Sequence, residues 1–192
     1  MGNRAVITTN VNIGKKNEIF GVYMTEDGVE LQNRKDKLGI YLHWNGGYDS
    51  VHAFLTYCKA KQYCEPTDDE AYSLARLVQV ISNFFGSGLS IGIDTMNNLD
   101  CDNYDNGVYI IGTDWEIVDR QYFNGCEQEN YKLRDMLIKI NESQPEKLTI
   151  EEIDEACKKE MEKNTQKKCI EDVLEDESLK DVPFDDRGDY NE

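Results

Sequence analysis

The two histidines of the chain stand close together, on either side of a glycine-rich turn. Between His43 and His52 the chain reads WNGGYDSV, so the carboxylate of Asp49 lies between two imidazoles. Imidazole and carboxylate groups can carry out general acid–base catalysis or hold a metal ion. A strand end that leads into a helix N-terminus also gathers backbone amides that bind anions. These three residues are therefore the candidate centre of a metal-dependent hydrolase.

A simpler interpretation of the same turn requires no chemistry. In this interpretation Gly46 and Gly47 form a tight turn, Asp49 caps the following helix, and His43 alternates with the core face of its strand. We favour it because the spacing of these residues matches no known metal-site or catalytic-triad pattern.

A second candidate site is the aspartate-rich segment IDTMNNLDCDNYDNG, residues 93–107. Its acidic residues are Asp94, Asp100, Asp102 and Asp105. Carboxylates at alternate positions resemble a calcium loop, but a loop beginning at Asp100 puts Tyr104 at position 5 and Ile111 at position 12, where oxygen ligands are required. The segment is therefore expected to be an acidic hairpin loop, or an acidic patch that binds a basic partner protein.

Motifs for nucleophilic catalysis or cofactor binding are missing from the sequence. There is no G-x-S-x-G, Walker A or G-x-G-x-x-G pattern, and Gly86-Ser87-Gly88 is better interpreted as the end of a helix. None of the six cysteines forms a C-x-x-C pair, which argues against zinc. Cys101 and Cys126 stand among acids and amides, which disfavour a reactive thiolate. We expect no catalytic residue, metal or cofactor, and a non-enzymatic function is favoured.

Charge is the dominant property of the composition. The net charge is −17 over 192 residues, a field that repels nucleic acids and anionic membranes and attracts basic protein surfaces. From Glu142 onward there are 18 acidic and 8 basic residues. A dense block of like charge is typical of an interaction tail. The tail acids expected to bind a partner are Glu171, Asp172, Glu175, Asp176 and Glu177.

Periodicity predicts the strands that would position these residues. Strands are expected at residues 4–9, 19–24, 29–31, 38–44, 89–94, 108–111 and 115–123. Asp27-Gly28 favours a tight hairpin turn between the second and third strands. Asn106-Gly107 is expected to close a loop that pairs residues 89–94 with residues 108–111.

Four helical segments are expected. The first begins near Ser50, with Asp49 or Ser50 as its N-cap. The second and fourth open with capping boxes, Thr67 to Glu70 and Thr149 to Glu152, and the third covers residues 133–140. The fourth is either one long helix or two. The predicted core faces of the first two are Val51, Phe54, Leu55 and Cys58, and then Ala71, Leu74, Ala75, Val78, Ile81 and Phe85.

Separate blocks of strands and helices predict an α+β fold, with an antiparallel or mixed sheet packed with two central helices and a C-terminal helical segment. The expected domains are an α+β core at 1–141, an acidic helical appendage at 142–182 and a disordered acidic tail at 183–192. No segment has the roughly 18–20 apolar residues that span a bilayer, and the N-terminus lacks an export signal. A cytoplasmic bacterial protein with reduced thiols is expected.

Five segments carry a resemblance to known sequences: MGNRAVIT, GIYLHWNGGYDSVHAFL, LVQVISNFFG, LSIGIDT and DNYDNGVYII. They resemble a group of small, mostly uncharacterised proteins of phages, plasmids and other mobile elements of Gram-positive bacteria. The resemblance covers residues 1–9 and about 38–123 and implies no particular chemistry. It implies a biological context, because small acidic proteins of such elements are often counter-defence factors, including anti-CRISPR inhibitors.

Our leading hypothesis is a non-enzymatic, anti-CRISPR-like inhibitor that blocks a basic groove by nucleic-acid mimicry. Its partner would be a basic protein such as a CRISPR effector nuclease, with no direct binding of nucleic acid or membrane. The aromatic anchors are expected to be Tyr104, Trp115 and Tyr122. The alternatives are the hydrolase at His43, Asp49 and His52 and a regulatory or scaffolding module.

Overall fold

The computed structural model describes residues 2–9, 23–25, 28–30, 37–88, 90–123 and 130–178, and for 23–25, 28–30 and 168–178 it describes the backbone. The chain divides into two units, Met1–Ala156 and Cys157–Glu192. The sequence analysis placed a boundary between residues 141 and 142. The first unit continues beyond that point, and Asn141, Leu148 and Ile153 are among its buried residues. The tail expected at 183–192 lies outside the described residues.

The elements follow the order of the expected blocks. The strands are β1 (Ala5–Thr9), β2 (Tyr23–Thr25), β3 (Gly28–Glu30), β4 (Leu38–Leu42), β5 (Ile91–Thr95), β6 (Val108–Ile111) and β7 (Ile117–Gln121). The helices are α1 (Tyr48–Ala60), α2 (Glu70–Phe85), α3 (Leu133–Ser143) and α4 (Ile150–Ser178), with short 3-10 turns η1 (Gly86–Gly88) and η2 (Thr113–Trp115).

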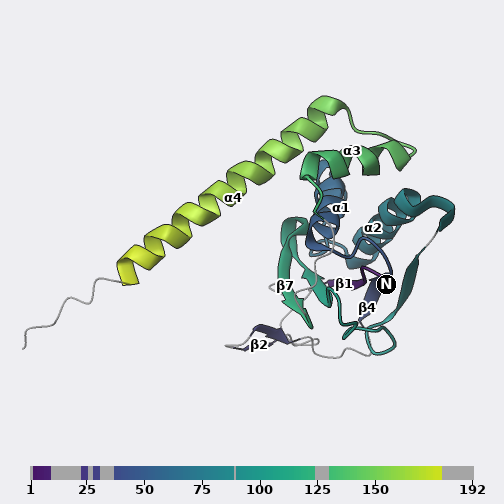
Figure 1. Cartoon of the computed structure of the whole chain (residues 1–192), viewed down its shortest axis with the longest axis horizontal. Coiled ribbons are helices and arrows are strands. Elements are labelled where there is room, and N and C mark those ends of the chain that lie inside the picture. The colour runs from purple at the N-terminus through teal and green to yellow at the C-terminus, as the bar shows by residue number, and fades with distance from the viewer. Residues whose placement is uncertain are drawn as a thin grey trace, which may run out of the picture. The chain divides into compact units, whose positions relative to one another are not determined.

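A mixed five-stranded sheet forms the centre of the first unit, in the order β5-β4-β1-β6-β7 (Figure 1). The middle strand β1 is antiparallel to β4 and parallel to β6, and all of its residues are buried. The outer pairs β4–β5 and β6–β7 are antiparallel. The predicted α+β class is confirmed, with a mixed rather than purely antiparallel sheet.

Two predicted hairpins have different outcomes. β2 pairs with β3, with Thr25 opposite Gly28, so the first hairpin is confirmed, although its turn residues Glu26 and Asp27 and the predicted strand residues 19–22 lie outside the described residues. The pairing of residues 89–94 with residues 108–111 is wrong. β5 pairs with β4 at the edge of the sheet, whereas β6 lies between β1 and β7. The reason is burial: all four residues of β6 are buried, which requires neighbours on both sides.

Helices α1 and α2 cover one face of the sheet, and α3 packs on both of them (Figure 1). The predicted core face of α1 is confirmed, and burial raises the pKa of the Cys58 thiol far above its ordinary value. The predicted face of α2 is partly wrong, because Ala71 and Ala75 are exposed and Leu77 and Val80 are buried in their place. The larger side chains remove more apolar area from water than two alanines do.

The N-caps of α1 and α2 also differ from the expectation. Gly47 occupies the N-cap of α1, and no side chain caps it. The helix therefore starts before Asp49, whose carboxylate lies in the first turn. The N-cap of α2 is Asp69, which accepts a hydrogen bond from the Tyr72 amide at 3.2 Å. Aspartate is a stronger cap than threonine and stands directly before the first helical residue, so the box from Thr67 is wrong.

The fourth helix forms as one continuous segment from Ile150 to Ser178, which settles the choice between one helix and two. Its capping box is confirmed. The Thr149 amide donates to Glu152 Oε2 at 2.7 Å, and the Glu152 amide donates to Thr149 Oγ1 at 3.2 Å. Among the helices that the structure describes, none combines the length and the apolar character needed to cross a membrane.

The opposite face of the sheet is covered by the connection between β5 and β6, residues 96–107. Met96 and Cys101 from this loop pack with Val6, Val108 and Ile110 of the sheet in one buried cluster. Tyr41 and Leu99 pack against the same cluster. The loop therefore covers the core on this side and also carries three of the four aspartates singled out in the sequence. The fourth, Asp94, lies on β5.

The Tyr57 hydroxyl links α1 to the segment of α3 by donating to Asn141 Oδ1 at 2.9 Å. Because Asn141 Oδ1 also accepts from the Leu148 amide, Tyr57→Phe leaves that oxygen satisfied and should cost only about 1 kcal/mol in the free energy of unfolding. Urea denaturation at neutral pH measures this loss. Tyr72→Phe is the matched control on the exposed face of α2; equal stability of the two variants would contradict the assignment.

Burial raises the pKa of Tyr57 to about 12. A raised tyrosine pKa means that the folded protein favours the neutral phenol, so the stabilisation is complete below pH of about 10 and is lost as the pH rises toward the folded value. The stability difference between the wild type and Tyr57→Phe should therefore shrink above pH of about 10. A constant difference across this range would argue against the raised pKa.

Candidate functional site

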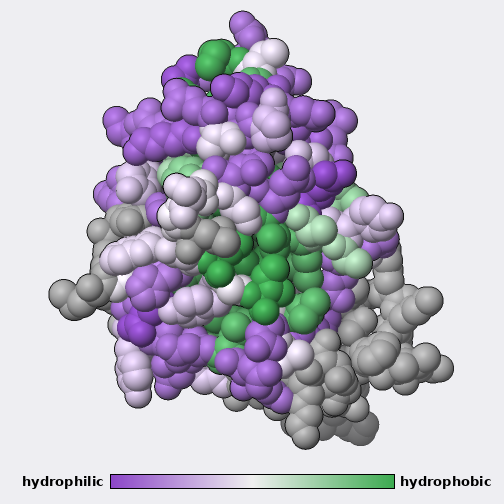
Figure 2. Space-filling view, turned by 90° about the vertical axis from the view of Figure 1, so that its right-hand side faces the viewer, coloured by the Kyte–Doolittle hydropathy of each residue, from purple (hydrophilic) through white to green (hydrophobic). Residues whose placement is uncertain are grey.

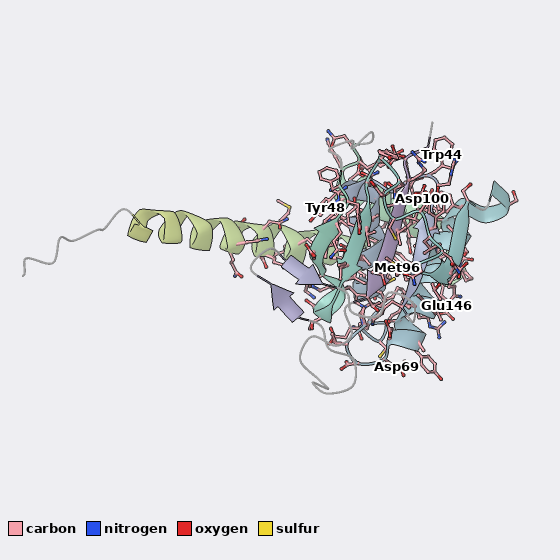
Figure 3. All side chains as sticks on the ribbon, turned by 90° about the horizontal axis from the view of Figure 1, so that it is seen from below. Trp44, Tyr48, Asp69, Met96, Asp100 and Glu146 are labelled. Carbon is pink, nitrogen blue, oxygen red and sulfur yellow. The ribbon has the colours of Figure 1, made fainter. Side chains whose placement is uncertain are left out.

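One end of the sheet gathers the two candidate regions that are far apart in the sequence. At this end Arg4 directly precedes β1, β4 runs into His43, and β6 follows Gly107. The Asn3 amide donates to the His43 carbonyl at 3.0 Å, and the Val6 amide donates to the Gly107 carbonyl at 2.8 Å. In Figure 3, Trp44, Tyr48 and Asp100 lie toward this end of the strands, and Asp69 lies toward the other.

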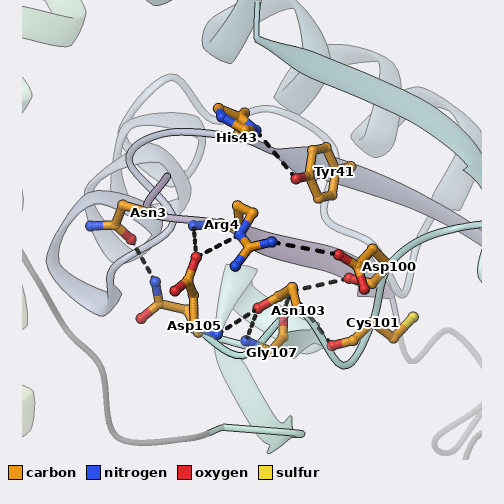
Figure 4. A network of polar contacts seen from close by, with 10 residues as sticks. Asn3, Arg4, Tyr41, His43, Asp100, Cys101, Asn103, Asp105 and Gly107 are labelled. Atoms are coloured by element: carbon orange, nitrogen blue, oxygen red, sulfur yellow. Dashed lines mark hydrogen bonds and ion pairs between the residues drawn. The ribbon is translucent and has the colours of Figure 1, made fainter. Parts of the chain in front are cut away.

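Arg4 is the centre of a polar network at this end (Figure 4). Its side-chain Nε donates to Asp105 Oδ2 at 2.7 Å, and its backbone amide donates to the same oxygen at 3.2 Å. A guanidinium nitrogen also lies 3.8 Å from Asp100 Oδ2. The hydrogen bond that Arg4 donates to the Asp105 carboxylate raises the pKa of Arg4. Asp105 is buried and Asp100 is exposed, so the first contact holds the loop and the second is a weak surface pair.

Asn103 fixes the shape of the acidic loop from inside. Its side-chain amide donates to the carbonyl oxygens of Asp100 (3.1 Å) and Gly107 (3.3 Å), and its Oδ1 accepts from the amides of Asp105 and Gly107, both at 3.1 Å. Asn103 itself is fully buried. The Asn103 side chain thus makes the hydrogen bonds to the loop backbone that a paired strand would make in a hairpin. These bonds hold the loop in one conformation.

The start of β6 requires glycine at position 107. Gly107 has φ +68°, and a Cβ at this position would lie 2.1 Å from the carbonyl oxygen of Gln121 on β7. Beside it, Asn106 Nδ2 donates to Asn3 Oδ1 at 2.5 Å, which ties the loop to the beginning of β1. The Asn106-Gly107 pair was predicted as a turn, and the structure uses it to enter the sheet next to β1.

The three residues of the hydrolase hypothesis have different neighbours. His43 Nδ1 lies 3.4 Å from the Tyr41 hydroxyl, and the His52 ring stacks on Tyr48 at 5.4 Å. The Asp49 carboxylate accepts from the Ser50 amide at 2.7 Å and the Tyr131 amide at 2.5 Å. Asp49 therefore anchors the segment that leads into α3. No group of three or more possible metal ligands occurs among the described residues.

His43 faces solvent and not the core. β4 ends at Leu42, and His43 lies beyond it with its side chain exposed. The turn itself is confirmed as a close approach of backbones, because the Gly46 amide donates to the Asn3 carbonyl at 2.8 Å and a Cβ on Gly46 would lie 2.6 Å from that oxygen. Burial raises the pKa of the neighbouring Tyr41 phenol, which keeps this hydroxyl protonated.

The remaining acidic residues of segment 93–107 are exposed. Asp94, Asp100 and Asp102 all face solvent, and Tyr104, at φ +57°, has 76% of its surface exposed. Asp94 accepts from the Thr95 amide and from the Asn98 side chain, and both donors are neutral. We call Asp94, Asp100, Asp102 and Tyr104 the acidic loop surface.

The other residues predicted to bind a partner are two aromatic side chains and the acids of the tail. The expected exposure of Trp115 is wrong, because only 4% of its surface is accessible and its indole N–H donates to the Tyr63 carbonyl at 3.3 Å. Tyr122 is exposed as expected. The predicted tail acids belong to α4, where the structure describes the backbone but not their side chains. They are Glu171, Asp172, Glu175, Asp176 and Glu177.

Arg4 and Asn103 were missed by sequence reasoning. Arg4 was assigned only to the first strand, and nothing local in the chain pairs it with an aspartate 101 positions away. Asn103 stood in a run of turn-forming residues, where asparagine is common for local reasons. A buried role for one asparagine among several needs the fold to be known.

Comparison with known proteins adds no relative. The chain matches no protein-family model, no curated protein and no solved structure. The function is therefore argued from the residues that the fold brings together.

Replacement of Asn103 tests the internal support of the loop. Asn103→Ala should lower the free energy of unfolding by roughly 2–3 kcal/mol, because it leaves several buried backbone groups unpaired. Hydrogen exchange should quicken at the amides of Asp105 and Gly107. Asn97→Ala is the control, since Asn97 is an exposed residue of the same loop. Equal urea midpoints for both variants would show that the loop does not need this side chain.

The pKa of Asp94 depends on the hydrogen bond that links this residue to Asn98. The hydrogen bond from the Asn98 side chain, with that from the Thr95 amide, holds the pKa of Asp94 below its ordinary value. The stabilisation is therefore present above the ordinary pKa and is lost as the pH falls through the lowered value. Asn98→Ala should raise the Asp94 pKa toward its ordinary value in an NMR titration. An unchanged titration curve would mean that Asn98 does not hold this carboxylate.

Proposed function

We propose that this chain is a non-enzymatic inhibitor that binds the basic surface of a nucleic-acid-handling effector through the acidic loop surface. The observation that carries the proposal is a loop that Asn103 and Arg4 fix from inside. With the adjoining strand β5 it presents three exposed carboxylates and an exposed tyrosine. A preorganised surface loses little conformational entropy when it binds.

The charge around this loop is strongly one-sided. Residues 94–123 contain seven acids, and Arg120 is the single base: Asp94, Asp100, Asp102, Asp105, Asp114, Glu116 and Asp119. Arg120 points its guanidinium over the Tyr109 and Phe123 rings, at 4.5 and 3.6 Å. Lys59, on α1, pairs with Asp114 at 2.6 Å and lies 3.6 Å from Glu116. Asp119 is half-buried and accepts a hydrogen bond from the Arg120 amide at 2.7 Å. The acids of the loop surface are therefore the ones left to face a partner, apart from the weak contact of Asp100 with Arg4.

A nucleic-acid-handling partner matches this surface chemically. Proteins that hold a nucleic acid line its path with lysine and arginine, and much of the affinity comes from neutralising phosphates. Exposed carboxylates on a rigid loop present the same charge to those residues, and Tyr104 supplies an aromatic anchor of the kind that dominates interface energies. A guided nuclease, with its long basic channel, is the specific partner class that we propose.

Identification of the partner is the direct experiment. The tagged chain is used to capture proteins from bacterial cells, and the captured proteins are identified by mass spectrometry at low and raised salt. A basic nuclease that is released as the Debye length falls from about 10 Å at 0.1 M toward about 3 Å at 1 M supports the proposal. Captured proteins that include no nucleic-acid machinery would overturn it.

Removal of the loop charges should weaken binding to the captured effector. The triple variant Asp94→Asn, Asp100→Asn and Asp102→Asn loses three exposed contacts of about 0.5 kcal/mol each, which corresponds to about a tenfold loss of affinity. The control has the same change in net charge on the helical side: Asp135→Asn, Glu142→Gln and Glu146→Gln. Calorimetric titration measures the affinity of both variants for the captured effector. Equal affinities would show that the loop carboxylates do not contribute to binding.

A further inference from the structure

Strand β5 is an edge strand whose outer side pairs with no other strand among the described residues. The His43 amide donates to the Ser90 carbonyl and the Met96 amide donates to the Lys37 carbonyl, at 2.9 and 2.8 Å. Hydrogen-bonding positions alternate along an antiparallel pair. The even-numbered residues of β5 therefore face β4, and the amides and carbonyls of Ile91 and Ile93 point away from the sheet.

The other edge of the sheet is protected and β5 is not. β7 carries Asp119 and Arg120, and its pairing with β6 shifts register between Ile110 and Ile111. Bulges and charged side chains of this kind are the usual means of blocking unwanted strand pairing. β5 has an unbroken register with β4 and contains no lysine, arginine or proline. Its single charge is Asp94, whose carboxylate also engages the Thr95 amide at 2.7 Å.

The face of this edge on the helix side of the sheet is apolar. Ile93 is 54% exposed and Leu38 of the neighbouring strand is 47% exposed, and both belong to the face on which Ile40 and Leu42 are buried. Ile93 is exposed because the helices do not cover the outer edge of the sheet. Figure 2 shows an apolar area bordered by polar residues on the side of the molecule that carries α2 and β5.

The surroundings of the edge are acidic. Residues 90–105 contain four aspartates and no lysine or arginine. Asp94 lies on the opposite face of β5 from Ile93. The loop packs on this face over β1 and β6, and Asp94 at the edge is exposed. The nearby Lys37 is paired with Glu70 at 3.2 Å. An extended segment placed here would therefore meet apolar groups with one side of its backbone and carboxylates with the other.

We propose that the outer edge of β5 binds an extended basic segment of the partner protein as a sixth strand. The backbone amides and carbonyls of Ile91 and Ile93 pair with the segment. Because side chains of a strand alternate between the two faces, its apolar residues lie against Leu38 and Ile93 and its basic residues face Asp94 and the acidic loop surface. This inference rests on the proposed function and specifies how the partner is held.

A second copy of the chain is a poorer occupant. Two β5 strands paired with each other would bring together two sets of the same aspartates on molecules that each carry a net charge of −17. Like charges placed opposite each other destabilise a strand pair. The basic segment removes this repulsion, and its backbone makes the same hydrogen bonds.

The test uses a defined probe on the full chain. A peptide of about nine residues with alternating lysine and valine has the length of a typical strand. Its binding is compared with that of the same peptide methylated at every backbone nitrogen, which keeps the charge but can donate no backbone hydrogen bond to a strand. We expect the unmodified peptide to bind about tenfold or more tightly, and to protect the amides of Ile91 and Ile93 from hydrogen exchange.

Matched substitutions locate the binding edge. Ile93→Lys should reduce binding of the unmodified peptide about tenfold or more, because it removes the apolar contact and adds a repelling charge. Val118→Lys places the same charge on β7, at a residue that is 43% exposed, and should leave binding unchanged. Both positions are exposed, and equal thermal midpoints of the two variants verify that folding is intact.

The outcomes separate this inference from the proposed function. Equal binding of the two peptides, or equal effects of Ile93→Lys and Val118→Lys, would overturn the strand-addition proposal. In that case, a loss of affinity for the captured effector in the triple aspartate variant would leave the proposed function standing. A dimer in sedimentation that Ile93→Lys dissociates would assign the edge to a second copy and overturn the basic segment.

Discussion

The fold depends on how the second face of the sheet is closed. Helices cover one side, and without a cover the other would expose Val6, Val108 and Ile110. The chain supplies that cover with a loop rather than with another element, and a loop over a core must satisfy its own backbone groups. Asn103 does so with one buried carboxamide, and the ion pair of Arg4 with Asp105 attaches the loop to the central strand.

This arrangement divides the aspartates of the loop into two classes. Asp105 is buried and pairs with Arg4, whereas Asp94, Asp100 and Asp102 are exposed. The inner contact gives the outer carboxylates a fixed position, which a solvated acidic tail lacks. The same loop begins at the edge strand, so charge, an aromatic side chain and an open strand edge occur on one continuous stretch of chain.

Sequence reasoning succeeded where a local pattern decides the structure. The core face of α1, the capping box of α4 and the strands β1 and β6 all follow from periodicity and short-range hydrogen bonds. It failed where long-range contacts decide. The burial of Trp115 depends on the carbonyl of Tyr63, and the role of Asp105 depends on Arg4. The pairing of β6 with β1 rather than with β5 is a topological choice that turn propensity alone cannot determine.

The parallel pairing of β1 with β6 sets the order in which this chain can fold. Arg4 and Asp105 are 101 positions apart, and the central strand has only one of its neighbours until Ile111 has been synthesised. Contacts of such separation carry the loop-closure entropy that slows folding. A nascent chain therefore exposes one edge of its fully buried central strand until β6 has been synthesised. During synthesis the N-terminal segment is the part of this chain most in need of a chaperone.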